Sequence, residues 1–363
     1  MKKIDLIVGA RPNFIKAFPV YNALENTGKF DLRLINTGQH YDENMADIFF
    51  RQLKMKQPDI DLMVGSGTHA EQTGKIMTVI EKVFMQNKPD LVMVFGDVNS
   101  TVATALSASK LHIPVAHIEA GLRSFDRNMP EEINRVLTDQ ISDLLFITSP
   151  EAKDNLLKEG KKESQIFFVG NTMIDSLVRF EEFFDGERFQ KKYNLKKKEF
   201  ILVTIHRPSN VDDPQKFNDL IHSLNQISEK HPIIWPVHPR TKKMINTNKV
   251  ILKPDVYTTD PIGYLEFMGL QKNAKMIITD SGGVQEESTY FNVPCLTLRE
   301  NTERPITISN GSNKLVGVDY SKLSEFVMQA INTKNINYNI PDLWDGKASK
   351  RLVKIISNKF KNY

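Results

Sequence analysis

Short apolar runs alternate with longer amphipathic segments along the first half of the chain. Between the runs, apolar residues recur every three or four positions, which is the spacing of a helix with one buried face. The runs expected to form strands are Ile4–Val8, Leu32–Asn36, Leu91–Phe95, Val115–Ile118, Leu144–Thr148 and Ile166–Val169. The helices are expected over Phe14–Asn26, Ser100–Lys110 and Glu131–Ile141. This alternation predicts a parallel sheet covered by helices on both faces.

The alternation stops at a charged, locally basic segment, Lys191–Glu199, and then starts again. The second set of strands is expected over Phe200–Thr204, Ile233–Val237, Met276–Thr279 and Cys295–Leu298. Its helices are expected over Pro214–Glu229, Tyr264–Gln271 and Val284–Tyr290. The fold class predicted is α/β, with two Rossmann-like, doubly wound domains over residues 1–170 and 171–347. A closing helix over 348–363 is expected to pack back on the N-terminal domain.

Length and composition agree with two domains of ordinary size. The chain has 363 residues, 40% of them apolar and 25% charged, which excludes disordered and disulfide-scaffold classes. The formal net charge of +4 is spread along the chain and gives no indication of nucleic acid binding. No apolar run is long enough to span a membrane. The single cysteine, Cys295, cannot form an internal disulfide and fits a reducing cytoplasm.

Polar residues follow the predicted strands. Doubly wound units bind ligands beyond the carboxyl ends of their strands, so these positions are where a site is expected. Glycine, aspartate and serine also occur there as ordinary turn residues, but seven such segments together favour a functional site. The segments are Gly9–Asn13, Thr37–His40, Gly96–Ser100, Glu119–Arg123, His206–Arg207, His238–Arg240 and Asp280–Gly283.

One of these segments has the features of a nucleotide site. Ser281, Gly282 and Gly283 stand at the mouth of a predicted helix, where free backbone N–H groups and the positive end of the helix dipole attract a phosphate. Glu287, one turn further, suits a ribose diol, although Glu286 or Glu287 could instead cap the helix. The sequence has neither a Gly-x-Gly-x-x-Gly after the first strand nor a P-loop. A nucleotide sugar is therefore favoured over a nicotinamide cofactor or ATP.

The candidate chemistry lies in the carboxylates Asp97, Glu119 and Glu131, since acid–base work on a sugar needs several groups whose pKa values neighbours can separate. Glu131 could alternatively only begin a helix after Pro130. His206 precedes an Arg and His238 a Pro-Arg, which suits phosphate contacts. No pattern indicates a metal site: the short Asp59-Ile60-Asp61 match is expected to be a solvated turn.

Taken together, these residues resemble the non-hydrolysing UDP-N-acetylglucosamine 2-epimerase family from Gly9 to about Gly317. The resemblance rests on Gly9-x-Arg11-Pro12 with Lys16, Thr37–His40, Gly96-Asp97, His117–Arg123, Pro130–Arg135, Gly170–Asp175, His206-Arg207, Thr279–Glu287 and Thr302–Pro305. It implies two domains that face each other across a cleft as in B-type glycosyltransferases, a homodimer, and no metal or nicotinamide cofactor.

The resemblance also implies roles for single residues. The UDP-sugar would be held by Arg11, Lys16, Phe267, Ser281, Gly282, Gly283, Glu287 and Arg304, with Phe267 against the uracil and Glu287 on the ribose. Asp97, Glu119, Glu131 and His206 would be catalytic. The implied reaction eliminates UDP to give 2-acetamidoglucal and adds it back, which inverts C2 and supplies a precursor of cell-surface polysaccharides. Which carboxylate is the base stays open. Gln39 and His238 match a second UDP-sugar site that some family members use.

Several departures keep alternatives open. The opening Gly9-Ala10-Arg11-Pro12 is common in members that act on UDP-2,3-diacetamido uronic acid sugars, whereas Thr302–Pro305 resembles the N-acetylglucosamine branch. A B-type glycosyltransferase, a binding protein without catalysis, and a hydrolase that releases UDP also fit the fold. Pro208 replaces a commonly basic residue, and Asp42 would repel a second diphosphate. Second-site binding is therefore expected to be weak.

Overall fold

The computed structural model describes residues 1–39, 56–333 and 338–360. Within it the chain divides into two compact units, which are described separately. Met1–Arg179 and Asp342–Tyr363 form the first unit, and Phe180–Pro341 forms the second. The second unit is therefore a continuous stretch of chain that interrupts the first.

The first unit is built on a parallel sheet with the order β3-β2-β1-β4-β5-β6-β7. Its central strands are apolar and fully buried, as expected for strands covered by helices on both faces. The strands are β1 (Lys2–Val8), β2 (Phe30–Asn36), β3 (Ile60–Asp61), β4 (Leu91–Phe95), β5 (Val115–Ile118), β6 (Leu144–Ile147) and β7 (Ile166–Phe168). The expectation of a solvated turn at Asp59–Asp61 was wrong, because Ile60–Asp61 pairs with Ile35–Asn36 at the sheet edge.

Helices cross between these strands. They are α1 (Arg11–Glu25), α3 (His69–Gln86), α4 (Asn99–Lys110), α5 (Pro130–Ile141), α6 (Pro150–Lys158), α7 (Thr172–Phe180) and α16 (Ala348–Lys359), with a short 3-10 turn, η1 (Glu163–Gln165). Helix α3 was not predicted. It begins at a capping box of Thr68 and Glu71 and buries Ile76, Ile80 and Phe84, which lie four residues apart on one face.

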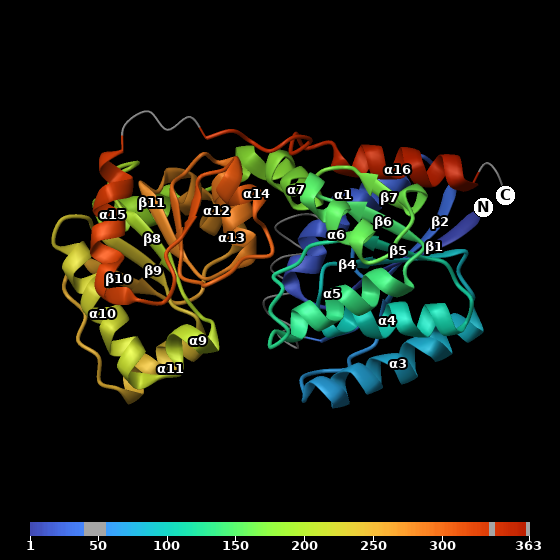
Figure 1. Cartoon of the computed structure of the whole chain (residues 1–363), viewed down its shortest axis with the longest axis horizontal. Coiled ribbons are helices and arrows are strands. Elements are labelled where there is room, and N and C mark those ends of the chain that lie inside the picture. The colour runs from blue at the N-terminus through green and yellow to red at the C-terminus, as the bar shows by residue number, and fades with distance from the viewer. Residues whose placement is uncertain (40–55, 334–337, 361–363) are drawn as a thin grey trace. The chain divides into compact units, whose positions relative to one another are not determined.

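The last helix belongs to the first unit. Both oxygens of Asp175 in α7 accept hydrogen bonds from the first backbone N–H groups of α16, at Ala348 (3.0 Å) and Ser349 (2.7 Å). Figure 1 shows α16, in red, beside the strands of this unit, and it packs on α1. Helix α7 is tied to the same unit because Ser176 Oγ donates to the Ile15 carbonyl at 2.6 Å. The boundary therefore follows α7 rather than residue 170.

The second unit repeats the topology with a parallel sheet of order β10-β9-β8-β11-β12-β13. Its strands are β8 (Ile201–Thr204), β9 (Ile233–Pro236), β10 (Val256–Thr259), β11 (Met276–Thr279), β12 (Cys295–Thr297) and β13 (Asn313–Leu315). Its helices are η2 (Glu181–Phe183), α8 (Glu187–Lys192), α9 (Pro208–Val211), α10 (Pro214–Ser228), α11 (Pro239–Thr247), α12 (Tyr264–Asn273), α13 (Gly282–Tyr290), α14 (Ile306–Ser309), η3 (Tyr320–Lys322) and α15 (Leu323–Asn332).

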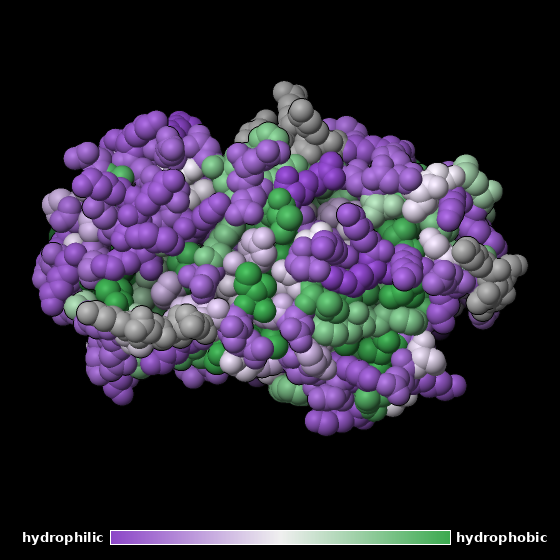
Figure 2. All heavy atoms as spheres, turned by 90° about the horizontal axis from the view of Figure 1, so that it is seen from above, coloured by the Kyte–Doolittle hydropathy of each residue, from purple (hydrophilic) through white to green (hydrophobic). Residues whose placement is uncertain are grey.

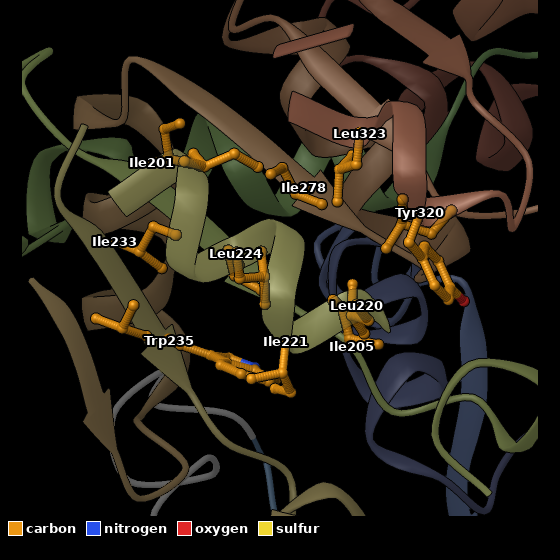
Figure 3. Close-up of a cluster of buried hydrophobic side chains, with 14 of the residues drawn as sticks. Ile201, Ile205, Leu220, Ile221, Leu224, Ile233, Trp235, Ile278, Tyr320 and Leu323 are labelled. Atoms are coloured by element: carbon orange, nitrogen blue, oxygen red, sulfur yellow. The ribbon is translucent and has the colours of Figure 1, made fainter. Parts of the chain in front are cut away.

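A large apolar cluster holds the second unit together. Leu220, Ile221 and Leu224 project from α10 toward Trp235 of β9, and the cluster continues to Leu323 of α15 (Figure 3). All of these side chains are buried. The apolar spacing of α10 thus serves to close one face of the sheet.

The six strands of the second sheet follow the same order as β3 to β6 of the first, which has β7 in addition: the chain starts near the centre, moves to one edge and returns to build the other half. This confirms the predicted α/β class and the doubly wound topology of each unit. The order reverses between β1 and β4 in the first unit and between β8 and β11 in the second, and such switch points are where ligands bind.

Figure 2 shows one face of the molecule, on which hydrophilic side chains predominate and hydrophobic ones form smaller groups. No helix in the described part of the chain combines the length and apolar character needed to cross a membrane.

Candidate active site

The carboxyl ends of β1 and β2 are joined tightly to the start of α4. Ser100 Oγ lies 2.7 Å from Thr37 Oγ1 and donates to Gln39 Oε1 at 2.7 Å. The Ser100 backbone N–H also donates to Gln39 Oε1, at 3.0 Å. A Cβ on Gly9 would lie 2.1 Å from Ser100 Oγ, so only glycine fits there. The side-chain oxygen of Gln39 is therefore engaged within the first unit.

Glu119 stands at the end of β5 and forms an ion pair with Lys16 of α1. Both side chains are buried. Glu119 has a φ of +75°, in the left-handed region that costs a non-glycine residue about 1–3 kcal/mol. The turn is held because the backbone N–H groups of Glu119 and Ala120 both donate to the Phe146 carbonyl at 3.0 Å. A buried charge on a strained backbone is typical of a functional position.

Asp97 follows β4 and forms an ion pair with Arg135 of α5. Arg135 is almost wholly buried, whereas about a quarter of the Asp97 side chain (24%) is exposed. Asn134 donates to the Asp97 backbone carbonyl at 2.9 Å. Glu131 lies in the first turn of the same helix and is exposed. Helix α5 thus brings Glu131 and Asp97 to the same edge of the sheet.

Glu132, next to Glu131, has a structural role. It accepts hydrogen bonds from the backbone N–H groups of Ser124 (3.0 Å) and Phe125 (2.9 Å), and from Arg135 Nε (2.9 Å). Burial alone would raise the pKa of Glu132, but these N–H groups and the Arg135 charge lower it below its usual value. Glu132 therefore anchors the loop after β5 and holds Arg135 in place for Asp97.

In the second unit, α13 begins directly after β11 with Ser281 as its N-cap. The first backbone N–H groups of a helix have no partner inside it, so this mouth suits an anion. A Cβ on Gly282 would lie 2.6 Å from Arg304 NH1, so the Arg304 guanidinium packs directly against the helix mouth. Arg304 is held by ion pairs with Glu286, at 3.0 Å from Nε, and with Glu303. Glu286 therefore positions an arginine and does not cap the helix.

The side chain of Glu287 is fixed from α12. Gln271 Nε2 donates to Glu287 Oε2 at 2.5 Å, and both residues are buried. Phe267 lies four residues before Gln271, on the same face of α12, and packs partly buried against the apolar cluster that includes Ile277. Phe267 and Glu287 thus lie on two helices that contact each other. Gln271 carried no recognisable signal in the sequence.

His206 follows β8 and is oriented by Asp280, which follows β11. His206 Nδ1 lies 3.0 Å from Asp280 Oδ1, and the backbone N–H groups of His206 (2.9 Å) and Arg207 (2.8 Å) donate to Asp280 Oδ2. Burial alone would raise the pKa of Asp280, but His206 and these donors lower it. The His238 ring is 5.4 Å from the His206 ring, and burial and the nearby His206 and Arg240 lower the pKa of His238.

Some predicted site residues lie outside this description. The side chain of Arg11 and residues His40 and Asp42 are not among those the structure describes. Within the described ranges there is no group of three or more histidine, cysteine or carboxylate side chains able to hold a metal ion. Burial raises the pKa of the Cys295 thiol to about 11, so it is a core residue and not a nucleophile.

The geometry thus defines a doubly wound α/β protein with a helix mouth suited to an anion in one unit and carboxylates at neighbouring strand ends in the other. The family model described as UDP-N-acetylglucosamine 2-epimerase matches residues 22–357. The chain belongs to this family, as its sequence motifs predicted.

Its relatives match over nearly their whole length. A UDP-N-acetylglucosamine 2-epimerase of Methanococcus maripaludis is 47% identical, with 98% of both chains covered. A UDP-2,3-diacetamido-2,3-dideoxy-D-glucuronate 2-epimerase of Pseudomonas aeruginosa is 42% identical, with 98% of this chain and 99% of that protein covered. The crystal structure of Methanocaldococcus jannaschii UDP-GlcNAc 2-epimerase, in complex with UDP-GlcNAc and UDP, has a TM-score of 0.90 at 46% identity and covers 98% of this chain and 99% of that one.

Proposed function

We propose that the protein catalyses the reversible C2 epimerisation of UDP-N-acetylglucosamine to UDP-N-acetylmannosamine. The observation that carries this proposal is the pair of carboxylates at neighbouring strand ends, Asp97 held by Arg135 and Glu119 held by Lys16. The chain that carries them is 46% identical to Methanocaldococcus jannaschii UDP-GlcNAc 2-epimerase, whose crystal structure is in complex with UDP-GlcNAc and UDP.

UDP binding is proposed for the second unit. The diphosphate would lie at the mouth of α13, on the backbone N–H groups of Gly282 and Gly283 and beside the Arg304 guanidinium. Glu287 would accept the ribose hydroxyls, and Phe267 would lie against the uracil. Asp280 orients the half-exposed His206 toward the phosphates or sugar.

The chemistry explains why several carboxylates are needed. The C2 proton is not next to a carbonyl group and is only weakly acidic, so cleavage of the C1–O bond must accompany or precede its removal. Carboxylates such as Asp97, Glu119 and Glu131 stabilise the resulting oxocarbenium character and move the proton, while donors around the departing UDP stabilise its charge. Protonation of the glycal from the other face and return of UDP then invert C2.

The test is to incubate the protein with UDP-N-acetylglucosamine in D2O and follow the sugar by proton NMR. Epimerisation predicts loss of the C2 proton signal and growth of a manno isomer with the diphosphate linkage intact. Transfer of the sugar to an added acceptor without C2 exchange would instead establish a glycosyltransferase. Accumulation of UDP with free N-acetylmannosamine would establish the hydrolase.

A second substrate is favoured by one observation. The Pseudomonas aeruginosa relative, which is 42% identical, is named for a UDP-2,3-diacetamido uronic acid sugar. Comparing kcat/KM for the two UDP-sugars decides between them. We prefer UDP-N-acetylglucosamine, because the 46% and 47% identical relatives carry that name.

We also propose a homodimer that works in the cytoplasm and supplies a precursor of cell-surface polysaccharides, in line with the family resemblance. The single, buried Cys295 fits a compartment without disulfides. Light scattering coupled to size-exclusion chromatography measures the mass directly, and a mass near 41.5 kDa would contradict the dimer.

A further inference from the structure

A buried hydrogen-bond network lies behind the carboxylates of the first unit. His117 of β5 and Asp139 of α5 are both fully buried. His117 Nδ1 lies 2.7 Å from Asp139 Oδ1, and His117 Nε2 lies 2.8 Å from the carbonyl oxygen of Gly96. The other carboxylate oxygen, Asp139 Oδ2, accepts the backbone N–H of Gly121 at 3.0 Å and lies 2.7 Å from Arg123 NH2.

Both partners of the His117 ring are acceptors. A backbone carbonyl oxygen accepts hydrogen bonds and never donates, and an ionised carboxylate has no proton to donate. Each ring nitrogen therefore needs its own proton, and the ring must be a positively charged imidazolium. The alternative, a protonated Asp139, is disfavoured because Asp139 Oδ2 accepts the backbone N–H of Gly121 and lies 2.7 Å from the Arg123 guanidinium, and both stabilise the ionised carboxylate.

The charges around this histidine balance. Asp139 faces the ring from α5, and Arg123 and Lys161 act on Asp139 from the segments after β5 and α6. Arg123 in turn binds both oxygens of Glu159, at 2.8 and 2.6 Å. The buried cations His117 and Arg123 are thus matched by Asp139 and Glu159, and the charge of Lys161 is also met by the nearby Asp143. This is the condition under which a buried charge is tolerated.

The network ends on the three segments that carry the proposed catalytic carboxylates. Gly96 directly precedes Asp97, Gly121 follows Glu119 by two residues, and Asp139 belongs to the helix whose first turn carries Glu131. Gly96 and Gly121 both have positive φ values, +64° and +79°, so each forms a sharp turn that needs a partner to fix it. His117 is the partner that fixes the turn at Gly96, and Asp139 is the partner that fixes the turn at Gly121.

We propose that His117 is a positioning residue: as an imidazolium paired with Asp139, it fixes the turn that carries Asp97 against the segments that carry Glu119 and Glu131. This rests on the proposed catalytic role of those carboxylates. Because His117 is fully buried, it is expected to act on the carboxylates through geometry. A displacement of about 1 Å at reacting groups costs on the order of 10²-fold in rate.

The charge state is tested by NMR on protein labelled with ¹⁵N-histidine. The His117 signals are assigned by their loss in His117→Gln. Both ring nitrogens are expected to show the imidazolium pattern. In Asp139→Asn, the amide can donate to Nδ1 while its oxygen still accepts from Gly121, so a neutral ring is expected there. A neutral ring in the wild-type protein would overturn the assignment.

The positioning role is tested by kinetics. His117→Gln is expected to lower kcat by roughly 10²-fold while the dissociation constant of UDP, which the second unit holds, stays within about twofold. Asp139→Asn keeps the hydrogen-bond geometry and is expected to lose much less. The matched control is Ile80→Ala, a core variant of α3 outside the network that also lowers the melting temperature. A folded His117→Gln that turns over as fast as Ile80→Ala overturns the proposal.

Failure of the proposed function gives a different pattern. A wild-type protein without C2 exchange, or an Asp97→Asn variant with normal turnover, overturns the catalytic assignment and with it the positioning role. The NMR result on the His117 ring stands apart from both, because it needs no substrate.

Discussion

Lys16 of α1 and Glu119 after β5 form an ion pair with both side chains buried, beside a backbone turn that only a strained φ at Glu119 allows. The ion pair ties the helix that follows the first strand to the strand end that carries a proposed catalytic carboxylate. A Cβ on Gly96 would lie 3.3 Å from Lys16 Nζ, so the lysine also lies close to the turn before Asp97.

Lys16→Met is expected to lower both stability and turnover. It removes the lysine from the buried ion pair with Glu119, and breaking such a pair from one side typically costs about 3–5 kcal/mol. Urea unfolding measures the stability, and C2 exchange in D2O measures the turnover. Lys16→Arg keeps the positive charge, so its stability and turnover should lie between those of the wild type and those of Lys16→Met. Wild-type stability in Lys16→Met would show that the pair contributes nothing.

Asp97→Asn, Glu119→Gln and Glu131→Gln are each expected to cut turnover by roughly 10²-fold or more, because removed acid–base groups typically cost that much. Binding of UDP, measured by calorimetry, should change far less, since the proposed UDP contacts lie in the second unit. Near-normal turnover in all three variants would contradict the catalytic assignment.

Gly282→Ala is expected to weaken UDP binding strongly. The added Cβ would lie 2.6 Å from Arg304 NH1 and 2.7 Å from Glu303 Oε1, so the guanidinium beside the helix mouth must move. The control is Gly74→Ala in α3, where a Cβ meets no atom within 4 Å. Glycine is poorer than alanine inside a helix by about 0.5–1 kcal/mol, so this control should bind UDP normally and be slightly more stable. Equal UDP affinity in both variants would contradict the site.

Asp280→Asn is expected to make stability depend less on pH in the acid range. The pKa of Asp280 is lowered in the folded protein, so its carboxylate stabilises the fold above the ordinary value of about 3.9, and this contribution disappears as the pH falls through the lowered pKa. The wild type should therefore be more stable than the variant near neutral pH, by about 1–3 kcal/mol, and the difference should shrink in acid. Exposed Asp154→Asn serves as the control. A difference that grows as the pH falls would show the sign to be wrong.

The rate is expected to depend on a single class of UDP-sugar site, with no contribution from a second one. Pro208 stands where a basic residue is common, so a second diphosphate would lose charge-assisted hydrogen bonds of about 1.5–3 kcal/mol each. The forward rate should follow a hyperbola, and pure UDP-N-acetylmannosamine should react without added UDP-N-acetylglucosamine. A sigmoidal forward curve, together with a reverse reaction that begins only when UDP-N-acetylglucosamine is added, would contradict the prediction of a single class of site.

The strands that build the sheet centres could be predicted from the sequence, and Leu91–Phe95, Val115–Ile118 and Met276–Thr279 have the predicted bounds. Such strands are buried on both faces, so continuous apolar residues identify them. The edge strands β3 and β13 are short and partly polar, and they form only because a neighbour offers hydrogen bonds. Their pattern does not differ from that of a loop.

The residues of the candidate site also divide into those that the sequence predicts and those that it does not. Positions after the strands, such as Asp97 and Glu119, follow from topology. The partners Arg135, Asp139 and Gln271 sit inside helices, and each becomes significant only when strand and helix packing brings it against a carboxylate or a histidine. That information is tertiary, and a pattern of neighbours along the chain does not contain it.

The capping of α16 by Asp175 has a consequence for how the protein is made. Residues from Asp342 onward complete the first unit, yet a ribosome produces them only after the whole of Phe180–Pro341. During synthesis the second unit can therefore close its core while the first still waits for its last helix, with Asp175 and the surface of α1 uncovered. The first unit, whose translation begins before that of the second, is therefore the last to finish folding.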